Sequence, residues 1–366
     1  MDNTKKARVI AFYLPQFHPI PENDRWWGKG FTEWTNVGKA KPLFKGHYQP
    51  RVPADLGYYD LRMPEVREAQ AKMAREAGIE GFCYWHYWFG NGKKLLERPF
   101  QEVLSSGKPD FPFCLGWANH SWTNKSWEAG TKRIKESTLV EMVYNKEEYV
   151  KHFYEVLPAF KDERYIQVDG KPLFLVFRPL EITDPHVFID IWQELAKKSG
   201  LKGIYFVGIA HNMLPQDLTF KNILLKNASD NSAFNYNSVL NAGYDAVNSR
   251  GYNRADYYSR SLIDFLWRGI CLRAFKYAPI SKCDQKKINQ YMYVKEDKWN
   301  NVFPTLMPNW DRTARSGSKA RIYTNSTPKL FRKQLLDVLD ILSNKDSEYR
   351  IAFLMSWNEW AEGNYV

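Results

Sequence analysis

The sequence predicts an α/β fold, a closed (β/α)8 barrel of the TIM type, on two observations. Eight short apolar segments, each of strand length, are separated mostly by helical patterns or long crossovers, as in a parallel sheet. Polar and aromatic clusters follow the first, second, third, seventh and eighth segments, and the C-terminal strand ends are where a barrel's active site lies. A doubly wound open sheet is the alternative, but it would gather these clusters at a single crevice.

The first half of the chain supplies four of the strands. We expect these strands, in chain order, at residues 8–13, 79–85, 111–117 and 171–177. An extended loop rich in aromatic and polar residues, 14–62, follows the first strand. Helices are expected over 64–78, 94–106 and 147–160. Another helix begins at Asp184, a typical cap followed by proline, and closes at Gly200.

The second half supplies the other four strands, expected at 203–209, 244–247, 302–306 and 351–355. Residues 212–243 are ambiguous, and a basic insertion around 259–300 begins with a helix over 259–277. A last helix begins at Thr327 and Pro328. Because no repeat, low-complexity tract or linker interrupts the pattern, we expect one domain, 1–366. The chain ends at Val366, soon after strand eight, so a barrel that lacks its last helix is one possibility.

Composition narrows the class of function. The chain is 44% hydrophobic and 25% charged, which suits a globular core, and its 16% aromatic content suits either a carbohydrate-binding protein or an aromatic core. The net charge of +11 favours an anionic partner, such as an acidic glycan or a lipid head group. No nucleic-acid motif accompanies this charge, so we expect no nucleic-acid partner.

The cysteines and the N-terminus indicate a compartment. Four cysteines without CxxC spacing suit free thiols in a reducing cytoplasm, the expected location. The first residues carry neither a signal-peptide pattern nor a membrane span, although peripheral membrane contact stays open.

The strongest candidate site is the end of strand eight, where an apolar run leads into Trp-Asn-Glu-Trp-Ala-Glu-Gly. Glu359 and Glu362 lie three residues apart beside indole rings and an amide. Paired carboxylates supply the acid and base of glycosidic chemistry, and aromatic faces stack on sugar rings. A strand end with structural salt bridges explains the pattern equally well.

Other strand ends and the loop 14–62 add candidates for substrate binding. If the barrel is right, the strand-end side chains converge on one cleft. Singly, an aromatic such as Trp117 or Tyr87 is more often core packing. The candidates are Tyr13, Gln16, His18, Trp34, His86, Tyr87, Trp117, Asn119, His120, Trp122, Trp310, Asp311, Asn358 and Trp360.

Several other chemistries lack their motifs. His18, His86, His120 and His211 follow strands, but no HxH or HExxH spacing occurs, so we expect no metal site. A GxSxG elbow, a Walker lysine loop and the Asp-x-Asp clamp of one class of sugar-nucleotide transferases are also absent from the sequence.

A series of aromatic and polar motifs extends over nearly the whole chain, at residues 11–18, 27–34, 47–50 with 55–60, 81–89, 117–122, 308–311 and 357–363. By these motifs and their order, the chain resembles the glycosyltransferase WbsX family, which is similar to the endo-mannosidases and endo-mannanases of glycoside hydrolase family 99. In those relatives the chain continues beyond the Glu pair with Glu-Pro and a closing helix.

The resemblance implies a retaining mechanism through a 1,2-anhydro sugar, without metal or nucleotide. Glu359 would take the proton of the sugar's 2-hydroxyl, and Glu362 would protonate the leaving oxygen and later deprotonate water. Tyr13 matches an active-site tyrosine of the relatives.

Three hypotheses follow. The first is an endo-acting glycoside hydrolase or transglycosylase of bacterial surface-polysaccharide (O-antigen or capsule) metabolism that uses no cofactor. Its substrate would be an oligosaccharide or polysaccharide, and an acidic or lipid-linked substrate is one interpretation. The second is a glycosyltransferase of lipopolysaccharide or polysaccharide biosynthesis. The third is a glycan-binding module without chemistry.

Overall fold

Eight parallel strands close into a barrel, which confirms the predicted (β/α)8 architecture. The computed structural model describes residues 6–124, 137–211, 232–274 and 279–366. Neighbouring strands pair in chain order, and β1 pairs with both β14 and β2, which closes the ring. The strands are β1 (Arg8–Tyr13), β2 (Gly81–Gly90), β4 (Phe113–Trp117), β8 (Lys171–Val176), β9 (Tyr205–Ala210), β10 (Ala246–Ser249), β12 (Val302–Leu306) and β14 (Ile351–Leu354).

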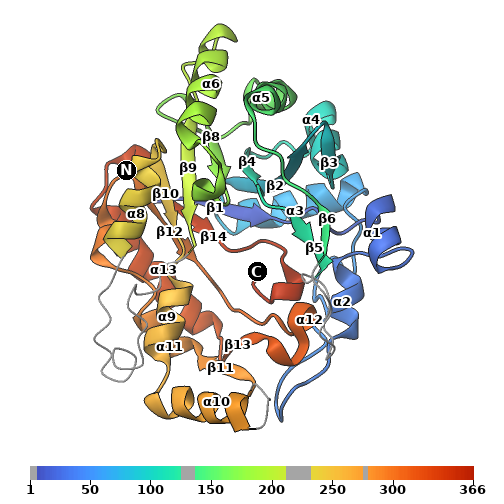
Figure 1. Cartoon of the computed structure of the whole chain (residues 1–366), viewed down its shortest axis with the longest axis vertical. Helices are drawn as coiled ribbons and strands as arrows, with labels where there is room; N and C mark the ends of the chain where they lie inside the picture. The colour runs from blue at the N-terminus through green and yellow to red at the C-terminus, as the bar shows by residue number, and fades with distance from the viewer. Residues whose placement is uncertain (1–5, 125–136, 212–231, 275–278) are drawn as a thin grey trace.

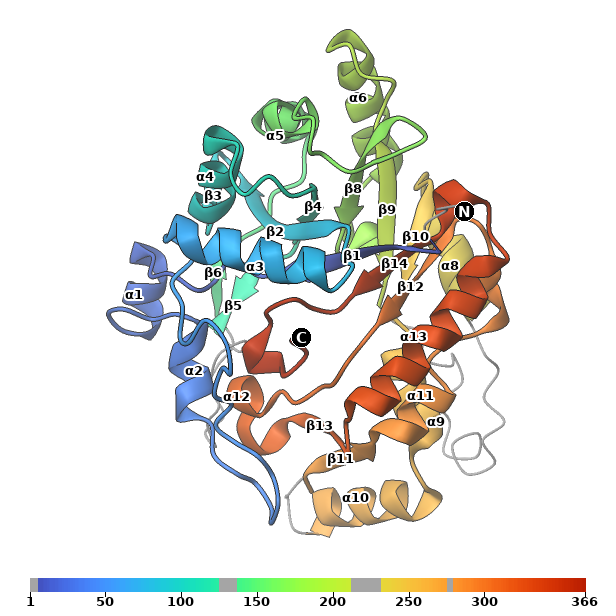
Figure 2. The same cartoon turned by 180° about the vertical axis from the view of Figure 1, so that it is seen from behind.

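Helices surround this ring as the periodicity predicts (Figures 1 and 2). Residues 212–231, most of the segment that the sequence leaves ambiguous, lie outside the described residues, as does the end of the helix expected over 259–277. The helices that follow strands are α3 (Pro64–Glu76), α4 (Arg98–Ser106), α5 (Lys146–Phe160), α6 (Pro185–Lys198), α8 (Ser232–Asn241), α9 (Tyr252–Ser259) and α13 (Pro328–Ser343).

Additional segments gather at the C-terminal end of the barrel. The loop 14–62 carries α1 (Pro21–Trp27) and α2 (Glu33–Lys39), and α12 (Thr313–Ser316) follows β12. The basic insertion carries α10 (Leu262–Ala274), β11 (Ser281–Asp284) and α11 (Gln285–Gln290), and β11 pairs with β13 (Arg321–Thr324). In Figures 1 and 2, α10 and α6 lie at opposite ends of the molecule. Four further strands are short: β3 (Lys93–Leu95) pairs with β2, β5 (Trp122–Thr123) pairs with β6 (Thr138–Val140), and β7 (Gln167–Val168) pairs with β8.

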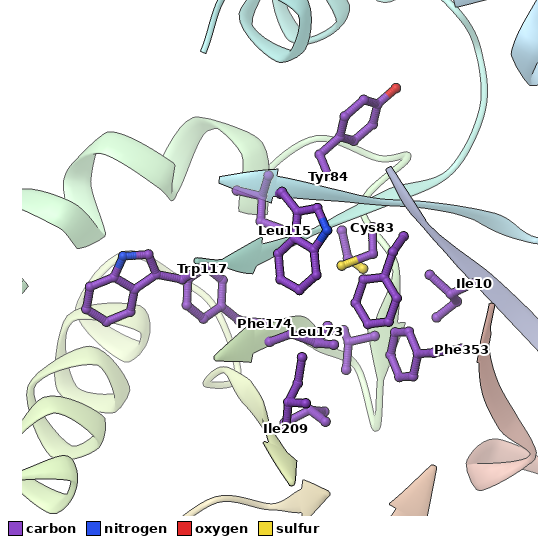
Figure 3. Close-up of a cluster of buried hydrophobic side chains, with 14 of the residues drawn as sticks. Ile10, Cys83, Tyr84, Leu115, Trp117, Leu173, Phe174, Ile209 and Phe353 are labelled. Atoms are coloured by element: carbon purple, nitrogen blue, oxygen red, sulfur yellow. The ribbon is translucent and has the colours of Figure 1, made fainter. Parts of the chain in front are cut away.

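Side chains alternate along each barrel strand between the lumen and the helix layer. Cys83 and Phe353 point into the ring, whereas Tyr84 points away from it (Figure 3). Inside, Phe12 stacks on Trp85 with ring centroids 4.9 Å apart. Because the strand period is two residues, adjacent residues at a strand end point to opposite sides, one into the lumen and the other into the helix layer.

The four cysteines are free and buried, as the spacing predicts. Within the described ranges, no helix combines the length and apolar character needed to cross a bilayer.

Gly251 follows β10 where two backbones nearly touch. A Cβ added there would lie 1.9 Å from the carbonyl oxygen of Met292, which is backbone and cannot rotate away. We therefore expect Gly251→Ala to lower the free energy of unfolding by about 2–3 kcal/mol through overpacking. Denaturant unfolding checks this value.

Gly269→Ala is the matched control, because a Cβ at this position in α10 meets no atom within 4 Å. Replacing an interior helix glycine by alanine stabilises by roughly 0.5–1 kcal/mol. Equal stability of Gly251→Ala and the wild type would contradict the close contact.

Candidate active site

A cavity of about 610 Å³ opens at the C-terminal ends of the barrel strands. Its floor is formed by lumen-facing side chains such as Phe12, Trp85 and Met355, and its wall includes side chains that follow β4, β10, β12 and β14. A volume of this size suits a ligand of several sugar units, and its position is the one that the barrel predicts.

Glu359 and Glu362 both line this cavity. Ser356 Oγ accepts a hydrogen bond from the Glu359 amide at 2.8 Å, which fixes the turn after β14. A short 3-10 helix, Trp360–Glu362, then turns the chain so that the carboxyl of Glu362 also faces the cavity. Gly363 ends this helix in the left-handed region at φ 64°. The three-residue spacing therefore brings both carboxyls to one wall of the cavity.

The two carboxyls have different partners. Arg315 Nη1 donates to Glu362 Oε1 at 2.6 Å, and Arg312 Nε lies 3.3 Å from the same oxygen. Arg315 Nη2 also donates to Glu33 Oε1 at 3.1 Å, and Glu33 is fully buried. Among the described residues, no cation lies within ion-pair distance of Glu359. Glu362 is thus held in a buried bridge, whereas Glu359 faces the cavity.

These neighbours separate the two pKa values. Burial, reinforced by the charge of Glu362, raises the pKa of Glu359 to about 7. Burial also acts to raise the pKa of Glu362, but the guanidiniums of Arg312 and Arg315 outweigh it and lower that pKa. A protonated carboxyl beside an ionised one is the arrangement that acid–base catalysis requires.

Aromatic rings and polar groups form the rest of the cavity. Trp310 stacks on Tyr252 with ring centroids 5.2 Å apart, and Trp122 packs edge-on against Tyr87. Burial lowers the pKa of His120 to about 4, so this ring is neutral near pH 7. The predicted site residues that the structure brings together here are Gln16, Tyr87, His120, Trp122, Trp310, Glu359 and Glu362.

The expectation that all the strand-end candidates face one cleft is wrong for those that point into the helix layer. The Tyr13 hydroxyl donates to Gln70 Oε1 of α3 at 2.5 Å. His86 Nε2 lies 2.9 Å from His152 Nε2 of α5, and Trp117 packs on the same histidine. Each alternates with a lumen-facing neighbour, as His86 does with Tyr87.

Three further candidates bind backbone groups instead of the cavity. Asn358 accepts from the Leu14 amide at 2.7 Å and donates to the Leu14 carbonyl at 2.9 Å, which ties β14 to β1. Asn119 makes a similar pair of bonds to the backbone of Arg178. His18 Nδ1 lies 2.9 Å from the Pro15 carbonyl. These contacts position the strand ends and satisfy the side chains.

The last three candidates hold the loop 14–62 in place. Asp311 accepts bonds from His47 at 2.9 Å and Gln49 at 2.6 Å, and it is buried. Trp34 donates to the Tyr59 carbonyl at 2.8 Å, and Trp360 donates to the Tyr59 hydroxyl at 3.2 Å. The bonds of Asp311 and Trp360 thus join the loop 14–62 to the segments that follow β12 and β14.

The arginines of the cavity were not among the site residues predicted from the sequence. Arg250 follows β10 directly, and Arg312 and Arg315 follow β12. The strand-end rule would have found Arg250 if strand six had been extended to Ser249, its observed end. In the part of the chain that the structure describes, no three His, Cys, Asp or Glu side chains form a metal-binding group.

Comparisons with known proteins agree with the sequence motifs. The sequence profile of the family described as glycosyltransferase WbsX matches residues 9–366. A Xanthomonas campestris pv. campestris protein described as uncharacterized protein WxcX is 33% identical over 366 residues, which are 99% of this chain and 47% of that protein. The same protein from strain B100 gives the same figures. The chain spans about half the length of these curated relatives.

Two solved structures share the fold at low sequence identity. The GH99 endo-alpha-mannosidase from Bacteroides thetaiotaomicron, in complex with BIS-TRIS-propane, is similar with a TM-score of 0.52 and 14% identity, covering 99% of this chain and 87% of the other. A structure described as a glycoside hydrolase-like protein gives a TM-score of 0.56 and 14% identity over 100% and 88% of the two chains. At such identities the likeness concerns the fold.

Because the pKa values of Glu359 and Glu362 are shifted in opposite directions, we expect removal of each charge to change the stability of the folded state in opposite directions. The raised pKa of Glu359 favours the folded state below about pH 4.5, and this contribution is lost as pH rises through about 7. We expect Glu359→Gln to unfold at a higher temperature than the wild type at pH 8, with the difference shrinking toward pH 5. Calorimetry at the two pH values measures it.

Glu362→Gln is the matched comparison. The lowered pKa of Glu362 contributes stability above its unfolded value, and this is lost as pH falls. Because Arg312 and Arg315 lose a buried partner, we expect this variant to be less stable at pH 8 by about 3–5 kcal/mol. Effects of the same sign for the two variants at pH 8 would contradict the assigned charges.

Proposed function

The chain belongs to the glycosyltransferase WbsX family, and on that premise we propose that it is a carbohydrate-active enzyme of bacterial surface-polysaccharide metabolism. It cleaves or transfers an internal glycosidic bond, with retention of configuration. The observation that carries the proposal is the pair of carboxyls, Glu359 and Glu362, with separated pKa values on one wall of an aromatic-lined cavity. Aromatic rings stack on sugars, and two such carboxyls suffice for the chemistry.

In the proposed reaction, Glu359 gives its proton to the glycosidic oxygen as the bond from this oxygen to the anomeric carbon breaks. Glu362 accepts the proton of the 2-hydroxyl, whose oxygen closes on the anomeric carbon to give a 1,2-anhydro sugar. Water, or an acceptor hydroxyl, then opens this ring at the anomeric carbon. The proton of this water or acceptor hydroxyl goes to Glu359, and Glu362 returns the first proton to the 2-oxygen. Both carboxyls thereby regain their starting protonation states.

This assignment exchanges the roles that the family resemblance implies, and the reason is the ion pairing. Arg315 at 2.6 Å and Arg312 at 3.3 Å favour the ionised form of Glu362, which suits a base. Glu359 combines burial with a neighbouring negative charge, which keeps its proton near neutral pH. A proton donor needs a pKa close to the working pH.

The name of the family leaves a second candidate function, because the family is described as a glycosyltransferase. A transferase uses an activated donor, whereas a hydrolase needs only water. The names of the solved structures with the same fold favour the hydrolase.

We expect the chain, incubated with a panel of bacterial surface polysaccharides in oxygen-18 water, to release fragments carrying one oxygen-18 at the new reducing end. Water attacks the anomeric carbon in the second step, so the label enters there. Mass spectrometry of the products detects it. Glu359→Gln and Glu362→Gln should each lower the rate about 10²–10⁴-fold.

Glu68→Gln, on the exposed surface of α3, removes the same charge away from the cavity and should retain the wild-type rate. Extension of an acceptor by an added donor sugar, without cleavage of any polysaccharide, would make the chain a glycosyltransferase and refute the hydrolase.

The two roles can be separated with a substrate that needs no proton donor. A 2,4-dinitrophenyl glycoside of the released oligosaccharide carries a leaving group that departs as an anion. In the first turnover we expect Glu359→Gln to release dinitrophenolate at close to the wild-type rate, whereas Glu362→Gln stays slow because the 2-hydroxyl still requires a base. Stopped-flow absorbance gives both rates. Rescue of Glu362→Gln alone would instead support the roles that the family resemblance implies, with Glu359 as the base and Glu362 as the acid.

A further inference from the structure

Positive charge dominates the side chains that line the cavity. Within the described residues, the only carboxylates of the lining are Glu359 and Glu362. The cations of the lining are Arg178, Arg250, Arg268, Arg312, Arg315, Lys319 and Arg321. An uncharged glycan does not require this excess, so the partners of each cation decide whether the excess is structural.

Several of these cations are neutralised within the chain. Arg312 and Arg315 pair with Glu362, as described above. Arg178 pairs with Glu181 on the exposed rim, and Arg321 lies 3.6 Å from Asp256. A structural role accounts for these four.

Arg250 is different, because it is buried without an ion partner. Its exposed fraction is 4%, and no carboxylate of the described residues lies within 4.0 Å of it. Its Nε and Nη2 atoms are buried and have no hydrogen-bond partner. Burying a guanidinium whose donors are unsatisfied costs several kcal/mol by order of magnitude, so such a group calls for a ligand.

The packing of Arg250 leaves its donors available. Its guanidinium carbon lies 4.8 Å from the ring centroid of Phe12, 5.6 Å from that of Phe177 and 5.7 Å from that of Trp85. Cation–π contacts with these rings stabilise the charge and fix the guanidinium. They provide no hydrogen-bond acceptor, whereas the N–H groups form a fork that matches an oxyanion.

The position of Arg250 relates it to the reaction. It follows β10 at the floor of the cavity, which Glu359 and Glu362 also line. The charges of both carboxyls act on Arg250, although neither forms an ion pair with it. A sugar held at the carboxyl pair would therefore have Arg250 within reach of its substituents.

We propose that Arg250 forms the centre of an anion-binding subsite that takes the carboxylate or phosphate group of a charged sugar, so that the substrate is an acidic glycan. The inference rests on the proposed function for the location of the reacting sugar. Arg268 and Lys319 line the same cavity with more exposure, and they attract the anion before Arg250 binds it. A guanidinium fork binds either oxyanion with two hydrogen bonds.

The test is a binding measurement that needs no turnover. The methyl glycosides of glucuronic and galacturonic acid are titrated against the 366-residue chain by NMR, beside the methyl glycosides of glucose and galactose. Glucose 1-phosphate beside glucose forms the phosphate arm. We expect at least one acidic ligand to bind tenfold or more tightly than its neutral counterpart, and the arm that shows the preference identifies the oxyanion.

Salt distinguishes the buried arginine from the exposed cations. Attraction by exposed charges is largely screened in 1 M sodium chloride, whereas a buried hydrogen-bonded pair is screened much less. We expect most of the acidic preference to survive 1 M salt. Equal binding of acidic and neutral ligands by the wild type in both arms, or complete loss of the preference in salt, would overturn the proposal.

Arg250→Gln should abolish the preference and leave the neutral ligands unchanged. Arg332→Gln removes the same charge from the exposed surface of α13 and should keep the preference. If Arg250→Gln fails to fold, Arg250→Lys retains the charge but not the fork, and the preference should fall severalfold. A folded variant at position 250 with the full preference would refute the subsite.

The anion subsite and the proposed hydrolase activity can be refuted independently of each other. An Arg250-dependent preference without cleavage of any polysaccharide would uphold the anion subsite and count against the hydrolase. Cleavage of a neutral polysaccharide by a chain that ignores acidic ligands would do the reverse.

Discussion

The geometry of the cavity depends on the buried bridge from Glu33 through Arg315 to Glu362. Glu33 lies in the loop 14–62, Arg315 follows β12 and Glu362 follows β14, so segments far apart in the sequence meet at one guanidinium. Glu33 also accepts the Ala361 amide at 3.2 Å, which fixes the turn between the two carboxyls. Removing any member of such a bridge leaves buried charge unpaired, at a typical cost of about 3–5 kcal/mol. The position of the loop and the ionisation of Glu362 are therefore set together.

The barrel and the location of the cavity at its C-terminal end could be predicted because both follow from local patterns. The first and seventh strands were expected at 8–13 and 302–306, and β1 and β12 have these bounds. Apolar runs of that length between helices have few other arrangements. Once strands are parallel, everything that follows them meets at one end, which is why Glu359 and Glu362 line the cavity together with Tyr87 and Trp310.

The facing of individual side chains could not be predicted from strand ends alone, because it depends on where the pleat begins and stops. The second strand was expected to end at Trp85, but β2 continues to Gly90, so His86 and Tyr87 belong to the strand and take opposite faces. Asp311 shows a second limit. Its partners His47 and Gln49 come from the loop 14–62, and no spacing in the sequence brings them together. A buried carboxylate satisfied by a distant loop resembles a catalytic one until its contacts are known.

In the proposed anion subsite, Arg250 would couple the charge of a bound acidic sugar to the protonation of the carboxyl pair. Its positive charge favours the ionised form of both carboxyls, although burial and the charge of Glu362 raise the pKa of Glu359 overall. An oxyanion bound to Arg250 would offset this influence, and both carboxyls would then hold a proton more strongly. By thermodynamic reciprocity, protonation of the pair would favour binding of the anion. An acidic sugar would thus help to retain the proton that its own cleavage consumes, and the bridge through Arg315 would keep the second carboxyl ionised meanwhile.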